Sequence, residues 1–335
     1  MKTKIYPLVL VLISSMIATG CFLGEKTSTD DSVSISDSHV HIMSPALIAY
    51  WKELGIPFSR PEEYYSNVDT ILFNNQAQSI DLIGMGYVYG NPEYYQGDDA
   101  EERLKAENDF ILNATQSYKD KVNPYIAVDP LKDYAVSELE RCYGLNPDIG
   151  LKLHFSTSQV YLTEPEHLKM VKPVFLKASA LKTPVLLHFD NWHPKFGKPD
   201  LELFADSILS QIDPIEIRIA HFGTSGGFNQ KTKDFIDAYL TLKTENRIPE
   251  KHKIYFDISA VALDKDSEGV PKLTEEAFTE LRSYINRIGI DNIIFGSDYP
   301  LYNSIDYIEV LKNKVGLTED EMRTIIDHAD SASKN

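Results

Sequence analysis

The segment "SISDSHVHIM", residues 34–43, sets two histidines two positions apart in a run whose apolar residues include Ile35, Val40 and Ile42. Successive side chains of a β-strand point to opposite faces, so we expect Asp37, His39 and His41 to share one face and Ser38 to lie on the other. Two neighbouring neutral imidazoles are suitable ligands for a metal ion. The alternative is a short surface strand whose polar face lies in water, and the rest of the chain has to decide between them.

Eight short apolar or β-branched runs recur along the chain, and this count is the main indication of the fold. They cover residues 35–42, 80–88, 122–128, 149–155, 184–189, 215–222, 254–259 and 292–295. Each has the length and composition that are typical of a buried strand.

The segments between these runs have apolar residues at helical spacing, as in 164–183, 200–212 and 274–289. Strands that alternate with helices long enough to connect parallel neighbours predict a (β/α)8 TIM barrel of the α/β class. The alternative is an open doubly wound sheet, but no glycine-rich phosphate loop follows the first strand. The long stretch 43–65 is expected to be a lid over the barrel mouth, an additional packing helix, or both.

The first residues differ from the rest of the chain. Lys2 and Lys4 precede an apolar run at 5–17 and small residues up to Cys21. This order is typical of a secretory signal, and the apolar run is short for a membrane span. We therefore expect a signal peptide at 1–20, a polar flexible tether at 21–34 and the barrel at 35–335.

Residues 18–21 resemble the lipobox of bacterial lipoproteins, with Ala18 where that motif usually has leucine. The resemblance implies that Cys21 is lipidated, that the protein is anchored to a membrane of the bacterial cell envelope and, because no Asp follows Cys21, that this is the outer membrane. The alternative is an ordinary signal peptide with an incidental cysteine.

Charge and cysteine content limit the partners and the covalent links. Without residues 1–20, which hold two lysines and no acidic residue, the net charge changes from −17 to −19. So acidic a chain repels phosphate backbones, which argues against a nucleic-acid partner. Cys142 is then the only cysteine besides Cys21, so we expect no disulfide within the barrel.

Polar residues gather at the ends of the predicted strands, where barrel enzymes place their catalytic groups. Besides the first strand, they are Lys152, His154, His188, His221 and Asp298. Taken singly, these residues could be structural: Lys152 and His154 could be an interior packing pair, and Asp298 could be a turn residue in "GSDYP". Together, two histidines from one strand, a third from another and a carboxylate from the last suggest a metal site with an open position for water.

With these motifs in place, the chain resembles the amidohydrolase superfamily, and within it the amidohydrolase-related group of small-molecule decarboxylases and lactone hydrolases. The resemblance rests on "DSHVH", "GLKLHF", "LLHFD", "IAHFG" and "FGSDYP", in this order over residues 35–330. It implies that His39, His41, His188 and Asp298 bind one divalent metal ion, most often zinc, and that His221 is the general acid or base.

Elementary chemistry agrees with this division of roles. A metal ion activates bound water, and a histidine can transfer a proton near neutral pH. Asp298 can both bind the metal and accept a proton. A second metal would need a carboxylated Lys152, and we favour one metal with Lys152 or His154 contacting the substrate. Three aromatic residues on predicted loops, Trp51, Trp192 and Tyr299, are expected to line the pocket, although ordinary packing would also account for them.

The sequence therefore predicts a secreted, lipid-anchored hydrolase that uses metal-activated water on a small ester, lactone or amide. The first alternative is a non-oxidative decarboxylase on the same scaffold, which would need cations for a substrate carboxylate. Only Lys152 and Arg60 are candidates, because Arg218 alternates away from His221 and is expected outside the barrel. The second alternative is a non-catalytic binding lipoprotein, against which the five filled catalytic positions argue. Neither the substrate nor the oligomeric state can be predicted.

Overall fold

The computed structural model describes residues 34–267 and 269–332. The expected signal peptide, Cys21 and all of the expected tether except Ser34 lie outside these residues. Within the described part of the chain, no helix has both the length and the apolar character needed to cross a bilayer.

Eight parallel strands form one sheet in the order of the sequence. They are β1 (Ser36–His41), β2 (Ser79–Ile83), β3 (Val122–Ala127), β4 (Gly150–His154), β5 (Val185–His188), β6 (Glu216–Ile219), β7 (Lys253–Asp257) and β8 (Ile293–Ile294). The sheet curls until the first strand meets the segment after the last: Ser38 N–H donates to the Phe295 carbonyl oxygen at 3.0 Å, and His41 N–H donates to that of Tyr299 at 2.9 Å. The predicted (β/α)8 barrel is confirmed as a nearly closed barrel.

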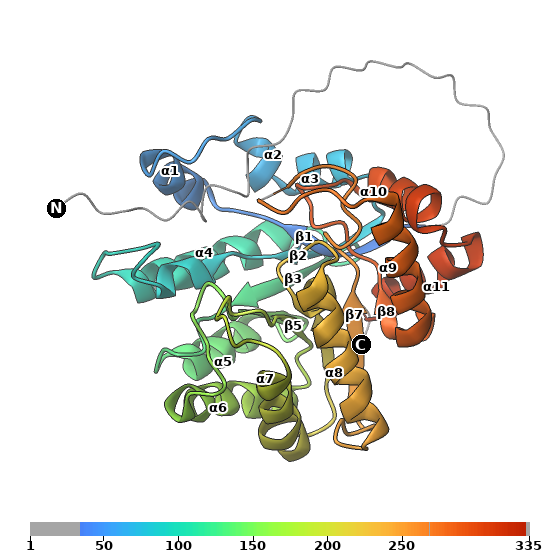
Figure 1. The fold of residues 1–335 in the computed structure, drawn as a ribbon. Coiled ribbons are helices and arrows are strands. Elements are labelled where there is room, and N and C mark those ends of the chain that lie inside the picture. The colour runs from blue at the N-terminus through green and yellow to red at the C-terminus, as the bar shows by residue number, and fades with distance from the viewer. Residues whose placement is uncertain (1–33, 268, 333–335) are drawn as a thin grey trace, which may run out of the picture.

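Helices surround the strands in chain order, from the blue end of the ribbon to the red end (Figure 1). They are α1 (Pro45–Glu53), α2 (Glu63–Ser66), α3 (Val68–Asn75), α4 (Ala100–Thr115), α5 (Ala135–Leu145), α6 (Pro165–Leu181), α7 (Lys198–Leu203), α8 (Gln230–Thr244), α9 (Glu275–Ile288), α10 (Ser304–Val310) and α11 (Glu319–Ala332). Short helical turns are η1 (Gly86–Gly90), η2 (Phe204–Ile208), η3 (Leu209–Gln211), η4 (Ala220–Gly223), η5 (Ile290–Asn292) and η6 (Leu311–Val315).

Local sequence explains why these helices form and which face they bury. In α6, Val171, Val174, Phe175 and Ala178 recur at the spacing of one helical face and are all buried. The side chain of Thr274 caps α9 by accepting a hydrogen bond from the backbone of the first turn at 3.2 Å. Helices with such apolar faces pack against the outward side chains of the strands and form the main core.

The stretch 43–65 serves both purposes that the sequence suggests. Ser44 caps α1, and Pro45 occupies its first turn. Leu47 and Ile48 are completely buried, while Trp51, also buried, lines a cavity at the barrel mouth. The segment is therefore packed against the barrel and walls the mouth as well.

Arg218 contradicts the prediction that it lies outside the barrel. It is fully buried, donates from Nε to Glu216 at 2.9 Å and forms an ion pair with Asp81 of β2, which is not a neighbour of β6 in the sheet. The two side chains therefore meet across the barrel interior. Ile83, two positions after Asp81, and Ala220, two positions after Arg218, belong to a small apolar cluster.

Candidate metal centre

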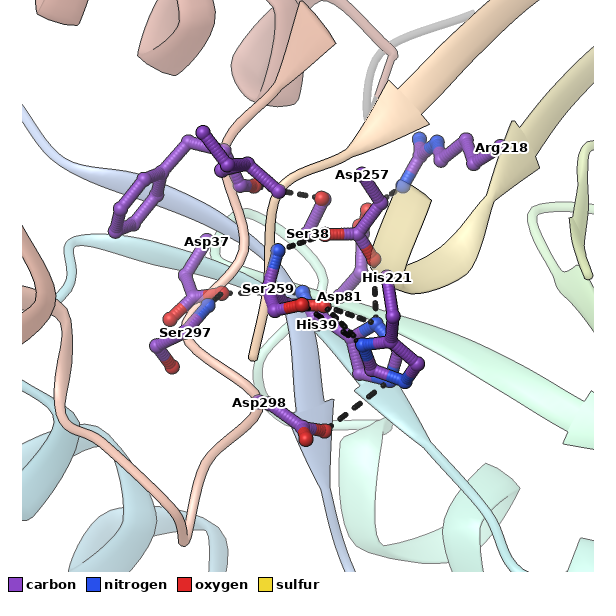
Figure 2. A network of polar contacts seen from close by, with 12 residues as sticks. Asp37, Ser38, His39, Asp81, Arg218, His221, Asp257, Ser259, Ser297 and Asp298 are labelled. Carbon is purple, nitrogen blue, oxygen red and sulfur yellow. Dashed lines mark hydrogen bonds and ion pairs between the residues drawn. The ribbon is translucent and has the colours of Figure 1, made fainter. Parts of the chain in front are cut away.

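The two histidines of β1 and the carboxylate that follows β8 meet at the mouth of the barrel. Nε2 of His39 and Nε2 of His41 lie 3.2 Å apart, and Oδ1 of Asp298 lies 3.4 Å from the first and 3.3 Å from the second. Figure 2 shows Asp298 pointing toward the His39 ring, with His221 beside it. Among the described residues, this is the one group of three or more potential metal ligands.

Hydrogen bonds on the far side of His39 determine which of its nitrogens faces this group. Nδ1 of His39 donates to the Asp257 carboxylate at 2.5 Å, and both side chains are fully buried. Nε2 therefore carries a lone pair, and a neutral imidazole held in this way by a carboxylate is the usual arrangement of a metal-binding histidine. Several lone pairs at such short distances repel one another unless a cation or a proton lies between them, so the residues fit a divalent metal ion.

The electrostatic surroundings favour the forms that bind metal. Burial, reinforced by the charge of Lys152, holds the pKa of His39 well below its usual value. Burial also lowers the pKa of His41. Burial by itself would raise the pKa of Asp298, but the neighbouring imidazoles, with His221 first, outweigh it and keep that pKa below the usual range. Neutral histidines beside an ionised carboxylate are the protonation states that a metal ion requires.

Backbone geometry after β8 explains how Asp298 comes so close. A Cβ atom at Gly296 would lie 2.7 Å from the Cβ of His39 and 2.8 Å from Oδ1 of Asp257, so only glycine allows this approach. Asp298 itself has a φ of 58°, a left-handed conformation that is uncommon for residues other than glycine. Strain of this kind collects at functional sites.

The alternation of side chains predicted that Asp37 shares the face of the two histidines. The structure contradicts this prediction. The register between β1 and β2 shifts after Asp37, and its carboxylate instead accepts hydrogen bonds from Asn75 of α3 at 3.0 Å and Ser304 of α10 at 2.8 Å. Backbone N–H groups of His39 and Ser297 also donate to it. Asp37 therefore anchors β1 to the surrounding helices rather than to the metal group.

His221 lies beside the group, 5.0 Å from His39 between ring centres. The sixth strand is predicted to extend to residue 222, but β6 ends at Ile219, because His221 and Phe222 adopt left-handed φ values of 51° and 54°. This turn lets His221 reach the cavity although Arg218 also points inward. Nδ1 of His221 lies 2.8 Å from the Ser259 carbonyl oxygen, which can only accept, so Nδ1 carries a proton and a neutral ring would have its lone pair on Nε2.

His188, at the end of β5, lies at the same cavity but outside the three-residue group. Its ring stacks on that of His154, with centres 4.0 Å apart, and its Nε2 lies 3.2 Å from Oγ of Ser225. Its role as the fourth metal ligand stays a prediction.

The cavity at the barrel mouth measures about 440 Å³ and contains the candidate site. Apolar and aromatic side chains form most of its wall, among them Trp51, Tyr87 and Trp192. Lys152 is the only lysine or arginine among the lining residues, it makes no ion pair within the described residues, and burial lowers its pKa to about 8. Tyr299 is not brought to the cavity: it is fully buried, and its hydroxyl donates to the Tyr64 carbonyl oxygen.

Other residues of the site were not found from the sequence. Asp257 ends the seventh strand and Ser259 follows it; Asp257 contacts His39, and Ser259 contacts both His39 and His221. Asp257 ends an apolar run in "KIYFDIS", the same pattern that singled out the histidines, so this signal was present. The contact of Ser225 with His188 comes from the fold of a loop, and no sequence pattern points to it.

Comparison with known proteins agrees with the fold and identifies the family. Residues 36–327 match the protein family described as amidohydrolase. The chain belongs to this family. No curated protein is similar enough in sequence to give a match.

Solved structures similar to this amidohydrolase are of low sequence identity and support the fold. A 5-carboxyvanillate decarboxylase from Sphingomonas paucimobilis is 14% identical, with a TM-score of 0.58 over 90% of this chain and 99% of that chain. A probable 2-pyrone-4,6-dicarboxylic acid hydrolase from Acinetobacter baumannii is 18% identical, with a TM-score of 0.55 over 89% and 98%. A manganese-bound 5-carboxyvanillate decarboxylase from Novosphingobium aromaticivorans is 14% identical, with a TM-score of 0.59 over 90% and 96%. The family and the site show an enzyme of the metal-dependent amidohydrolase superfamily.

Proposed function

We propose that this amidohydrolase hydrolyses an ester, lactone or amide bond of a small molecule with metal-activated water. The observation that supports hydrolysis is the position of the protons. Asp298 is held ionised, and His221, which carries a proton on Nδ1 toward Ser259, has a lone pair on Nε2 when its ring is neutral. Two proton acceptors beside the candidate metal site suit the deprotonation of water, the first step of hydrolysis.

The metal ion would be held by His39, His41 and Asp298, with His188 as the proposed fourth ligand. When bound, it supplies a water of lowered pKa and polarises the substrate oxygen. Two imidazoles and a carboxylate suit zinc, which we propose as the ion; manganese, bound in the similar decarboxylase from Novosphingobium, is the alternative.

Groups that can donate hydrogen bonds face the cavity beside the metal group and would orient the substrate. Nδ1 of His154 accepts from the Thr157 backbone N–H at 3.3 Å, so a neutral His154 carries its proton on Nε2. Lys152 offers an ammonium group that no acidic side chain within the described residues neutralises through an ion pair. We propose that both contact substrate oxygens and that Trp51 and Trp192 pack on its apolar part.

Decarboxylation is the second candidate, and the unpaired Lys152 is the observation that favours it. An ammonium group in an apolar cavity is a suitable partner for a substrate carboxylate. Two of the similar structures are 5-carboxyvanillate decarboxylases, although their low identity supports the fold alone. Decarboxylation needs a proton on the carbon left behind, and neither an ionised Asp298 nor a neutral His221 with its proton on Nδ1 has one on the cavity side.

The test compares metal-stripped protein with protein reconstituted with Zn²⁺ or Mn²⁺. Hydrolysis of members of a lactone and ester panel, lost in His221→Asn, is the expected result. Release of carbon dioxide from carboxylated aromatic acids would instead establish the decarboxylase. Absence of both reactions and of bound metal would leave a binding protein.

We also propose, from residues 1–21, that Cys21 carries a lipid that anchors the enzyme in the cell envelope, in the outer membrane. Metabolic labelling with an alkyne fatty acid tests this proposal. Wild-type protein should take up the label and float with outer-membrane vesicles, and Cys21→Ser should do neither. Equal labelling of the two would contradict the anchor.

A further inference from the structure

The hydroxyl group of Ser225, at the cavity wall, has three polar partners. It lies in the loop after β6, where Gly226 and Gly227 adopt left-handed φ values of 97° and 69°. Its Oγ donates to Oδ2 of Asp190 at 3.0 Å, accepts from the indole Nε1 of Trp192 at 2.5 Å and lies 3.2 Å from Nε2 of His188. A single hydroxyl therefore connects the loop after β5 with the histidine that ends β5.

The partners of this hydroxyl determine which atom donates and which accepts in each of its hydrogen bonds. A hydroxyl has one proton and two lone pairs. The proton goes to Asp190, because an ionised carboxylate only accepts, and Trp192 uses one lone pair, because an indole nitrogen only donates. The remaining lone pair faces His188, so Nε2 of His188 must be the donor. In a neutral ring, Nδ1 of His188 is then unprotonated.

Asp190 is itself held firmly in this orientation. It is buried, and its Oδ1 accepts from the Trp192 backbone N–H at 2.8 Å and from the Lys231 ammonium at 2.5 Å. Asp190 forms an ion pair with Lys231, and a carboxylate acceptor makes the hydrogen bond from Ser225 stronger and better defined. A chain of hydrogen bonds therefore runs from Lys231 through Asp190 and Ser225 to His188.

We propose that Ser225, held by Asp190, is a positioning residue that keeps His188 protonated on Nε2 and so presents its Nδ1 to the metal ion. This inference rests on the proposed metal-dependent function. It assigns opposite ring atoms to two ligands: His39, protonated on Nδ1 by its contact with Asp257, presents Nε2, and His188 presents Nδ1. Partners that orient metal-binding histidines in this way usually contribute a 10- to 100-fold gain in metal affinity.

The same hydroxyl links His188 to the loop at the cavity entrance. Trp192 lines the cavity, is 41% exposed and has a left-handed φ of 59°. Because its indole and His188 share the oxygen of Ser225, a substrate that packs on Trp192 is in contact with the group that orients the metal ligand.

The first experiment determines the tautomer in the metal-free wild-type chain, and a variant serves only to assign the signals. Long-range ¹H–¹⁵N correlation spectra of ¹⁵N-histidine-labelled protein distinguish the two tautomers of each ring, and the His188 signals are those lost in His188→Gln. A protonated Nε2 and an unprotonated Nδ1 are expected. The opposite tautomer in the wild type would overturn the inference.

The second experiment measures affinity for Zn²⁺ and Mn²⁺ alone by competition with a chelator. Ser225→Ala should lose the single tautomer and bind metal about 10- to 100-fold more weakly, and Ser225→Thr, which keeps the hydroxyl, should restore both. Ser267→Ala, which removes another hydroxyl from the cavity wall, is the control and should change neither.

The outcomes separate this inference from the proposed function. Unchanged metal affinity in Ser225→Ala, with the unfolding temperature of the wild type, overturns the role of Ser225 and leaves the metal-dependent enzyme standing. A wild-type chain that binds no metal overturns the proposed function and the ligand role of His188 together.

Discussion

Asp257→Asn tests most directly whether hydrogen bonds control the metal ligands. The carboxylate accepts through both oxygens: Oδ1 from the Ser259 backbone N–H at 2.8 Å and Oδ2 from Nδ1 of His39 at 2.5 Å. An amide has a single acceptor oxygen. If that oxygen stays on the Ser259 N–H, the amide NH₂ faces Nδ1 of His39 and drives the proton to Nε2, the atom that must bind the metal.

The size of this effect follows from the buried geometry. To recover the correct tautomer, the amide must rotate and leave the buried N–H of Ser259 without a partner, which costs about 1–3 kcal/mol. That cost corresponds to about 5- to 150-fold in affinity, before the loss of the negative charge of Asp257 is added. Competition of metal-stripped protein with a chelating dye will measure the affinity, with the exposed Asp266→Asn as the control. Wild-type affinity in a folded Asp257→Asn variant would refute this control of the ligand by its hydrogen bond.

Three further predictions follow from the described contacts. Replacing His39 by Ala should abolish metal binding, whereas His221→Asn should keep the metal and lower kcat about 100- to 10,000-fold; metal analysis and turnover of the same samples check both, and metal loss in the second would contradict its role. Arg218→Met should lower the free energy of unfolding by about 3–5 kcal/mol, because Asp81 loses its buried cation, and adding Asp81→Leu should recover part of this in urea denaturation; wild-type stability of the single variant would refute it. Burial lowers the pKa of Lys152 to about 8 from an ordinary 10.5, so its charge opposes folding below pH 8 and this cost disappears between about pH 8 and 10.5. The stability of metal-free wild type relative to Lys152→Met should therefore rise across that interval, and a flat difference would show that Lys152 is not desolvated.

The sequence predicts the strands well because each is a short, largely apolar run, and several of these runs end at or near a polar residue. That pattern located β1, β4, β5 and the approach to His221, and the polar ends meet because parallel strands of a barrel end at the same rim. The prediction of the face on which a side chain lies fails where the backbone departs from the two-residue repeat of a strand. The register shift after Asp37 turns that side chain toward α3 and α10, and a shift of one residue reverses the face of a strand.

Arg218, near the end of β6, shows the same limit of predicting the face of a side chain by counting alternate positions. Counting alternate positions from His221 places Arg218 on the opposite face, but the count crosses the end of β6, and His221 itself adopts the left-handed conformation. Both side chains therefore point inward. The partner of Arg218, Asp81, is 137 positions away in the sequence, and no local pattern can identify it. Contacts of this kind depend on barrel closure, which is a property of all eight strands together.

The position of Arg218 also decides the charge of the metal centre. Because it is bound to Asp81 and Glu216, Lys152 is the one lysine or arginine lining the cavity, where it faces the charges of Asp298 and Asp257. When the imidazoles are neutral, the carboxylates of Asp298 and Asp257 and the ammonium of Lys152 give the metal-free centre a net charge of one negative unit. Binding of a divalent ion changes this to one positive unit. A buried site with one positive charge is stabilised by one anion, which hydrolysis supplies as hydroxide from water and decarboxylation as the substrate carboxylate.

This local charge prevails over the acidity of the whole chain. The net charge of −17 repels anions at long range, but physiological salt screens charges beyond about 8 Å, and a buried centre is screened far less. An anionic substrate group would therefore be selected inside the cavity, by Lys152 and the proposed metal ion, and not by the outer surface. Because Lys152→Met removes the positive excess of the metal-bound centre, it should weaken binding of an anionic substrate far more than binding of a neutral one of the same shape.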